Sequence, residues 1–426
     1  MKTKKISDFV NINYKAFAIY TALKRGLPGL YDGLKPVQRK AWYCANKDLK
    51  KVSALTGDLM SKANYHHGDA AANGAISKMA QDFPGGNNYP LLHKKGNFGN
   101  KFVKTPSAAR YVYVKRNPLF EKIFKDAFLH KCNSDKESPE PAFFLPIIPT
   151  ILLNGISGIA VGFAVDIQPY NMLDIINYTK AYISKKTTPE LKPFYKGFNG
   201  DIVENDEKYI MYGKWEKINT TTIRIVEIPV NHDRLSYIKH LINLRDKGLI
   251  VSYKDESKES WKLTVKLPRN SIVWKDPVKY LKLSLNLKQN FTVVDSNDVI
   301  IVFDTVYELI NHFIDHRISV YDRRIAYMKD KLSNDIIFNK NKIKFIKYLS
   351  ALSFKKMTKD EIKGKMKDKY NFIDDHLDKF MQTSVYNLNT DYIEELQKKI
   401  TDLKVELSYY KKVKNITLYN IDLDNI

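Results

Sequence analysis

Two apolar heptad seams near the C-terminal end constrain the architecture of this chain most. Beyond about residue 306 the sequence is rich in lysine and has almost no glycine or proline. Apolar residues there recur at alternating steps of three and four, from Ile318 to Leu332 and again from Ile393 to Tyr410. Such steps place one apolar stripe along each of two helices. We expect one helix leading outward, a second returning beside it, and a small helical knob between them at about 333–392. The alternative is two ordinary amphipathic helices packed on a globular core.

The rest of the sequence separates into two zones, which gives three expected domains: 1–170, 171–305 and 306–426. The first zone mixes short helical patterns with glycine-rich turns. The second has β-branched runs at 220–227, 261–265 and 299–303, broken by prolines, with a helical stretch at 235–249. Together with a length of 426 residues, this indicates a multidomain α+β fold.

Charge and cysteine usage narrow the functional classes. Lys and Arg number 70 against 47 Asp and Glu, a formal net charge of +23, which points to a polyanionic partner. Cys44 and Cys132 are the only cysteines, so a disulfide framework or cysteine-rich zinc site is excluded, and we expect a cytoplasmic protein. Residues 141–165 carry no charge, but their prolines and glycines would break a membrane helix. We predict buried, turn-rich core there and no membrane association.

Several nucleotide and metal chemistries lack their motifs. The sequence has no phosphate-binding Gly-x-x-x-x-Gly-Lys-Ser/Thr loop, no Gly-x-Gly-x-x-Gly after a strand and no His-Glu-x-x-His, which argues against an ATPase or a metalloprotease. The only Asp-x-Asp pair is Asp422 and Asp424, at a C-terminal end where we expect fraying. We therefore predict no metal site in this chain and expect another polypeptide to supply most ligands of any divalent ion.

Basic and histidine side chains gather in the first zone, near glycines that would let a backbone approach phosphates. This set suggests a phosphodiester site, although composition leaves open whether the site binds or cuts. The residues are Arg25, Lys35, Arg39, Lys40, His66, His67, Lys94, Lys95, Arg110, Lys115 and Arg116.

Tyr111 is the candidate nucleophile of this zone. A tyrosine phenol has a pKa near 10, so attack at neutral pH needs a neighbouring cation to stabilise the phenolate and the pentavalent phosphate. Arg110, directly before Tyr111, provides one. Most of the 27 tyrosines in the chain must be packing residues, and Tyr113, two positions on, is the competing candidate.

Five segments together resemble the breakage-reunion subunits of type IIA DNA topoisomerases. They are Arg25–Arg39 with its Asp-Gly-x-Lys-Pro core, Tyr65–Asp69, Gly96–Gly99, Ala108–Tyr111 and Asn154–Gly162. Their order matches the family over about 140 residues, and weaker similarity continues into the C-terminal helices.

This resemblance implies a fold and a set of roles. The three domains would be a winged-helix DNA-cleavage domain, an α/β tower domain and an antiparallel coiled coil whose knob is a dimer gate. Tyr111 would attack a DNA phosphate and form a 5′-phosphotyrosyl bond, while Arg110 steadies that phosphate. Ile159 would be an apolar wedge that bends the duplex. The remaining expected DNA-binding residues are Arg25, Lys35, Arg39, His66, His67 and Asn97.

The resemblance also implies partners. Two tyrosines must cut opposite strands of double-stranded DNA, so a homodimer is expected. Mg²⁺ would be held mainly by a separate Toprim subunit and ATP by a separate ATPase subunit, so that this isomerase would act only with its partners. Because the sequence stops at Ile426, where gyrase continues into a DNA-wrapping domain, we expect relaxation or decatenation rather than supercoiling.

Some positions depart from the bacterial pattern. Gln38 stands where gyrase-type subunits usually carry His, and His66-His67 lacks an intervening proline, as in eukaryotic and T4-like phage enzymes. Ala70 and Gly74 stand where bacterial enzymes carry the Ser and the acidic residue that anchor quinolones, so we expect a weak quinolone response. Two alternatives stay open: a non-enzymatic DNA-bending architectural dimer and, within the family, a cellular subunit of the topoisomerase IV type.

Overall fold

The computed structural model describes residues 6–133, 138–205, 208–351, 358–370, 372, 374–382 and 389–426. The chain forms two compact units, one made of Met1–Arg317 with Asp422–Ile426 and the other of Ile318–Ile421. The first two expected domains both fall within the first unit, and the division between them stays a prediction.

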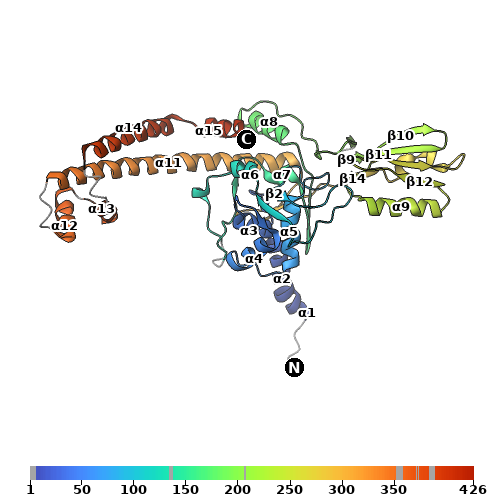
Figure 1. Cartoon of the computed structure of the whole chain (residues 1–426), viewed down its shortest axis with the longest axis horizontal. Coiled ribbons are helices and arrows are strands. Elements are labelled where there is room, and N and C mark those ends of the chain that lie inside the picture. The colour runs from blue at the N-terminus through green and yellow to red at the C-terminus, as the bar shows by residue number, and fades with distance from the viewer. Residues whose placement is uncertain are drawn as a thin grey trace, which may run out of the picture. The chain divides into compact units, whose positions relative to one another are not determined.

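The beginning of the first unit is a three-helix bundle with a small antiparallel sheet (Figure 1). It starts with α1 (Ile6–Asp8), a π-helical turn (Phe9–Tyr14), α2 (Lys15–Thr21) and a second π-helical turn (Ala22–Gly26). The bundle consists of α3 (Pro36–Cys44), α4 (Val52–Lys62) and α5 (Asp69–Ala80), and the sheet has the order β1 (Lys50–Lys51), β3 (Tyr113–Arg116), β2 (Leu92–Lys95). Three helices with a three-stranded sheet form the winged-helix arrangement that the motifs imply.

The uncharged segment is partly core and partly exposed. It follows α6 (Pro118–Ile123), β4 (Phe124–Lys125) and a 3₁₀ turn (Ala127–Leu129), and it contains β5 (Leu145–Pro146), α7 (Thr150–Asn154), β6 (Ile156–Ala160) and part of β7 (Phe163–Ile167). Residues 143–153 are buried, as predicted, but the tip of the β6–β7 hairpin is not, and Ile159 is 86% exposed. The prediction of buried core was therefore wrong for the hairpin tip. No described helix is both long and apolar enough to span a bilayer.

The described residues in the second part of the first unit form two sheets, three helices and a hairpin. The four-stranded sheet has the order β10 (Lys214–Asn219), β11 (Thr222–Glu227), β13 (Leu263–Lys266), β12 (Ser252–Asp255), and the three-stranded sheet β14 (Ser284–Leu287), β9 (Lys208–Tyr212), β8 (Asp201–Asn205). The helices are α8 (Met172–Ile183), α9 (Arg234–Asp246) and α10 (Pro277–Tyr280), with a 3₁₀ turn (Ile272–Lys275), and the hairpin is β15 (Phe291–Val294) with β16 (Ile300–Phe303). The strands and the helix expected from the β-branched and helical runs are confirmed, with ends shifted by a few residues.

Helix α9 covers the four-stranded sheet because its apolar stripe meets the inward face of the strands. Tyr237, Leu241 and Leu244 of the helix join Ile223, Ile225, Leu263 and Val265 of the sheet in one buried cluster. Alternate residues of β11 are buried, the period-2 pattern of a strand with one face in a core. We refer to this cluster, with Trp261 and Phe102, as the tower core.

The second unit contains the antiparallel helix pair that the heptad seams predict. It contains most of α11 (Val306–Ala351), all of α14 (Thr390–Lys412) and most of α15 (Asn415–Asp424). The Tyr321 ring lies 4.8 Å from that of Tyr419, and Lys342 Nζ donates to Tyr392 Oη at 2.9 Å. Early residues of α11 thus pair with late ones of the returning helices, and later residues of α11 with the start of α14, so the antiparallel arrangement is confirmed.

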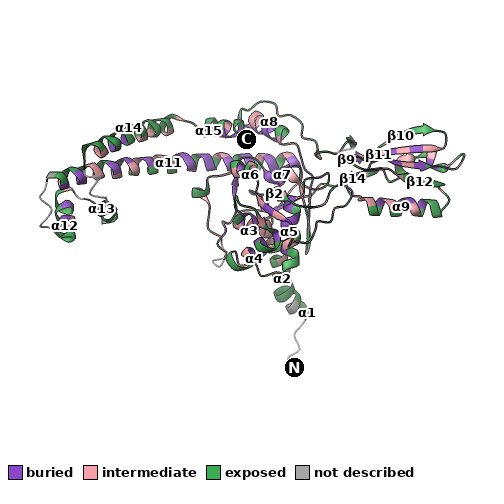
Figure 2. Cartoon of the chain, viewed as in Figure 1, coloured by how far each residue is buried: buried purple, intermediate pink, exposed green. Residues whose placement is uncertain are grey.

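The expected knob has its own buried cluster (Figure 2). Helices α12 (Lys359–Tyr370) and α13 (Asp374–Met381) contribute Ile362, Met366 and Leu377, which pack with Phe345 of α11 and Leu396 of α14. Parts of the predicted gate, residues 352–357, 371, 373 and 383–388, lie outside the described residues.

The C-terminal end is helical and carries two ion pairs, so the expectation of fraying was wrong. Helix α15 continues to Asp424. Lys125 Nζ lies 2.7 Å from Asp422 Oδ1, and Lys180 Nζ lies 2.5 Å from Asp424 Oδ1. Both carboxylates thus serve as structural ion-pair partners within the first unit.

Candidate functional site

Tyr111 lies in a tight turn between Asn97 and the start of helix α4. Its backbone N–H donates to Ala108 O at 2.9 Å, which closes the turn. The Val52 and Ser53 N–H groups donate to Val112 O and Ala109 O, at 3.0 and 3.2 Å. Backbone bonds on both sides of Tyr111 therefore fix the position of its Cα without using its side chain.

The side chain of Tyr111 faces solvent beside a cation. It is 64% exposed, and the Arg110 guanidinium carbon lies 4.8 Å from the centre of its ring. A guanidinium at this distance makes a cation–π contact. Tyr113 differs, because it is half-buried in β3, opposite Lys51 and Lys95 of the neighbouring strands. Of the two candidates, Tyr111 is the one with an accessible phenol and a neighbouring arginine.

Asp32 organises the motif at residues 25–39 from within the core. Its carboxylate is fully buried and accepts hydrogen bonds from the backbone N–H groups of Leu34 and Phe144, at 3.1 Å each. It also accepts Arg39 Nε and Nη2, at 2.6 and 2.9 Å. Burial alone would lower the pKa of Arg39, but the Asp32 carboxylate raises it above its usual range. The Arg39 guanidinium thus pairs with an internal carboxylate, and its contact with DNA stays a prediction.

Sequence reasoning missed the role of Asp32. The signal was its place within the Asp-Gly-x-Lys-Pro core, seven residues before Arg39.

Lys35 connects helix α3 to the exposed hairpin. Its Nζ donates to Ser157 O at 2.8 Å, two residues before Ile159. Burial and the nearby Lys78 charge lower the pKa of Lys35. At the same place Gly26 and Gly158 approach each other so closely that a Cβ added at Gly158 would overlap Gly26 O. Strand β6 is therefore held by backbone contact with Gly26 and by Lys35, while the side chain of Ile159 remains in solvent.

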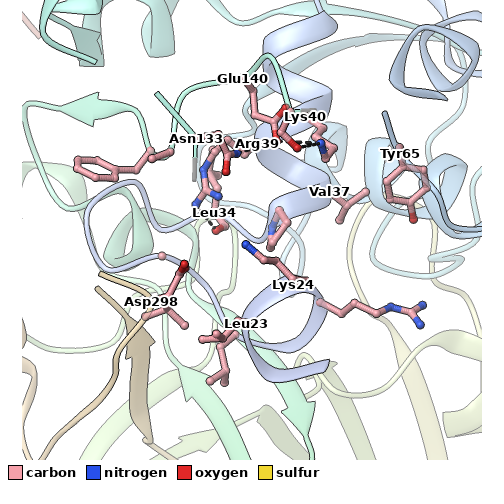
Figure 3. A pocket seen from close by; sticks show the side chains of 18 of the residues that line it. Leu23, Lys24, Leu34, Val37, Arg39, Lys40, Tyr65, Asn133, Glu140 and Asp298 are labelled. Carbon is pink, nitrogen blue, oxygen red and sulfur yellow. Dashed lines mark hydrogen bonds and ion pairs between the residues drawn. The ribbon is translucent and has the colours of Figure 1, made fainter. Parts of the chain in front are cut away.

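A cavity of about 440 Å³ beside helix α3 collects several of the predicted residues (Figure 3). Arg25, Arg39, His66 and His67 all line it. One wall carries a buried ion pair, in which Lys40 Nζ lies 2.9 Å from Glu140 Oε1 (Figure 3). The other predicted site residues, Lys35, Asn97, Arg110, Tyr111 and Ile159, are not part of its lining.

The two histidines differ in exposure. His66 is exposed, whereas His67 is partly buried and its ring lies edge-on to those of Tyr20 and Tyr65, with centroids 6.4 and 5.3 Å away. Burial lowers the pKa of His67, and the positive charges of Arg25 and His66 lower it further. The imidazole of His67 is thus favoured in its neutral form.

Asn97 is exposed, but both of its oxygens accept hydrogen bonds from neighbouring backbone N–H groups. Its side-chain oxygen accepts the Gly99 N–H at 2.9 Å, and its backbone oxygen accepts the Ser107 N–H at 3.0 Å. Through this second bond Asn97 is tied to the segment that leads into Tyr111.

Metal-ligating side chains do not gather in the part of the chain that the structure describes. No group of three or more His, Cys, Asp or Glu side chains there is arranged to hold an ion.

The comparisons with known proteins place these features in a family. The sequence model of the A subunit of DNA gyrase/topoisomerase IV matches residues 25–424. This range is most of the chain, so the chain belongs to the family of DNA gyrase/topoisomerase IV A subunits. The resemblance inferred from the five motifs is confirmed.

Individual relatives agree with this assignment. The chain is 28% identical to the DNA topoisomerase medium subunit of Enterobacteria phage T4, in a match that covers 100% of this chain and 99% of that protein. It is 33% identical to DNA topoisomerase 2 of Plasmodium falciparum over 81% of this chain but only 26% of that protein. The chain thus spans nearly all of the phage relative and about a quarter of this eukaryotic one.

A solved structure confirms the fold class. The DNA-binding, cleavage and re-ligation domain of Plasmodium falciparum topoisomerase II has a TM-score of 0.87 at 29% identity. The match covers 98% of this chain and 63% of that chain.

Proposed function

We propose that this chain is the DNA-cleaving and rejoining subunit of an ATP-dependent type II topoisomerase. The Tyr111 phenolic oxygen attacks a backbone phosphorus, a P–O bond to tyrosine forms, and the P–O3′ bond breaks. The phenol gives up its proton as it attacks, and the electron pair of the broken bond stays with O3′, which takes up a proton to become a 3′-hydroxyl. The phosphotyrosyl ester keeps most of the energy of the broken bond, so rejoining is the same step in reverse.

The observation that carries this proposal is the exposed phenol of Tyr111 with the Arg110 guanidinium over its ring. A nucleophile for a duplex must be accessible, and a phenolate at neutral pH needs a fixed positive charge nearby. The turn leaves the Tyr111 side chain accessible, and it places the Arg110 guanidinium beside the phenol ring.

The experiment uses Tyr111→Phe with Tyr113→Phe as its matched control. Each change removes one phenolic oxygen, at positions two residues apart in the sequence. With partner subunits, Mg²⁺ and DNA, rapid denaturation should trap protein on DNA 5′ ends. We expect trapping to be abolished in Tyr111→Phe, with DNA affinity unchanged, and retained in Tyr113→Phe. A chain that binds and bends DNA but never yields an adduct would be an architectural protein instead.

The same proposal assigns DNA contacts to the side chains around the turn and the hairpin. Ile159 would enter the base stack as a wedge. The residues that would face the sugar–phosphate backbone of the DNA are Arg25, Lys35, His66, His67 and Asn97. For Arg39 the ion pair with Asp32 supports a structural role, in which it stabilises the segment at residues 25–39 rather than contacting phosphate directly.

Partner subunits are part of the proposal. The T4 relative is named as a medium subunit, and the family match begins only at residue 25. The preceding helical segment exposes Ile6, Ile12 and Phe17, at 83%, 68% and 59%. A helix with apolar side chains on several faces is normally buried. We assign residues 6–21 to contact with a separately encoded partner protein.

The remaining functional assignments follow from the resemblance. The active form would be a homodimer joined with Toprim and ATPase subunits, which supply most Mg²⁺ ligands and the ATP site. It would relax or decatenate DNA in the cytoplasm, of the host cell if the chain is encoded by a phage. Incubating the reconstituted complex with relaxed plasmid and ATP tests the outcome, since negative supercoils would contradict it. A cellular subunit of the topoisomerase IV type is the alternative within the family.

A further inference from the structure

The loop that leads into Tyr111 is fastened to the tower core by one aromatic side chain. Phe102 lies nine positions before Tyr111, outside the winged-helix bundle. Its ring is 8% exposed and lies 4.6 Å from the Trp261 ring in an edge-to-face arrangement. An aromatic pair of this geometry stabilises the folded state by more than the burial of its apolar area alone. Phe102 thus packs in a core built otherwise from residues of the 220–285 region.

Polar contacts reinforce the same connection. Phe102 O accepts the backbone N–H of Arg234, the first residue of α9, at 2.9 Å. Two residues on, Lys104 Nζ donates to Val230 O at 2.6 Å, and burial lowers the pKa of Lys104. On the other side of Phe102, Lys101 Nζ lies 3.9 Å from the buried Glu227 carboxylate. Three closely spaced links join the loop to the end of β11 and the start of α9.

The loop is stiff between this anchor and the winged-helix bundle. Gly99 has φ +86°, and a Cβ there would lie 2.7 Å from Val103 O and 2.8 Å from Lys104 O. Gln81, at the end of α5, donates its side-chain amide to Phe98 O and Lys104 O, both at 2.9 Å. Asn100 Oδ1 accepts the N–H groups of Phe102 and Val103. A folded loop of this kind transmits a displacement, whereas a flexible one would absorb it.

We propose that Phe102 is a positioning residue for Tyr111, which holds the nucleophile in register by fixing its loop to the tower core. The inference rests on the proposed function, because it concerns the geometry of that cleavage step. Phe102 itself touches no reacting atom. Its effect is on the position of the phenol, and a misplacement of about 1 Å can lower a rate about a hundredfold.

The test compares Phe102→Ala with Leu241→Ala in the reconstituted complex. Both truncate the tower core, but Leu241 lies on α9 and is fully buried there, so its loss leaves the loop anchor in place. We expect Phe102→Ala to slow the formation of the covalent adduct by about tenfold to a hundredfold with an unchanged dissociation constant for DNA. Leu241→Ala should lower stability without this loss of rate.

Two further variants keep the test decisive if Phe102→Ala folds poorly. Phe102→Leu keeps an apolar plug and should recover most of the rate. Lys104→Met keeps the core intact but removes the hydrogen bond to Val230, and it should slow adduct formation in the same direction.

The inference would be overturned if Phe102→Ala and Leu241→Ala slowed adduct formation equally, or if Phe102→Ala kept full activity. In either case, adduct formation by the parent protein would still support the proposed function. If the parent protein forms no adduct with its partners, the proposed function itself fails.

Discussion

The exposed tip of the β6–β7 hairpin allows a quantitative prediction about DNA bending. Ile159 is 86% exposed in the free protein, and intercalation between base pairs would bury its side chain. Ile159→Ala removes three carbon groups, each worth about 0.8 kcal/mol when buried, or about 2.4 kcal/mol in total. At about 1.4 kcal/mol per factor of ten, the bent state should become up to about 50-fold less favoured relative to the straight complex.

Folding should be almost unaffected by this substitution. An exposed side chain loses little buried area, and surface changes of this kind stay within about 0.5 kcal/mol of the parent stability. Leu173→Ala is the matched control, because Leu173 is 62% exposed on α8 and loses the same three carbons. The two variants thus differ in position rather than in chemistry.

The assay measures fluorescence energy transfer between the ends of a short duplex bound to the reconstituted complex. We expect Ile159→Ala to lower the bent fraction and Leu173→Ala to leave it at the parent value. Equal bending by Ile159→Ala and the parent protein would refute the wedge. A parallel loss in both variants would instead attribute the effect to general apolar contact.

Three other predictions concern stability and drug response. Arg317→Met leaves the buried Asp126 without its guanidinium, 2.6 Å away, and should lower the free energy of unfolding by about 3–5 kcal/mol in denaturant titrations; a loss below about 1 kcal/mol would contradict it. Burial lowers the pKa of His130 in the folded protein, so the unfolded chain binds a proton more readily at this side chain. The stability that the neutral imidazole contributes is therefore lost as the pH falls below about 6.5. His130→Gln should flatten the decrease in melting temperature between about pH 7 and 5. Ala70→Ser with Gly74→Glu, where an added Cβ at Gly74 meets nothing within 4 Å, should raise quinolone-stimulated cleavage, and an unchanged drug response would count against the anchoring argument.

Local periodicity predicted the helical part of the fold well. The two heptad seams identified α11 and α14 and their antiparallel pairing, because a repeated apolar stripe has few ways to be buried. The β-branched runs located β11, β13 and β16, and alternate residues of β11 and β13 are buried, so that these two strands place one face in the core.

Features that depend on distant partners were not predictable from the sequence. Phe102 sits in no periodic pattern, and its burial depends on Trp261, far along the chain. An arginine in a basic cluster looks the same in the sequence whether it binds phosphate or a carboxylate, and the pairing of Arg39 with Asp32 is visible only in the folded structure. Asp422 near a chain end suggested fraying, but Lys125 stabilises it. In each case a contact that the local pattern does not encode decided the outcome.

The apolar side chains exposed on residues 6–21 have a consequence for the behaviour of the isolated chain in solution. With a net charge of +23, copies of the chain repel each other at low ionic strength, and this repulsion keeps the apolar segments apart. At about 1 M salt the screening length falls to about 3 Å, and that barrier disappears. The purified chain should then self-associate as salt rises, whereas the assembly with its partner stays dispersed.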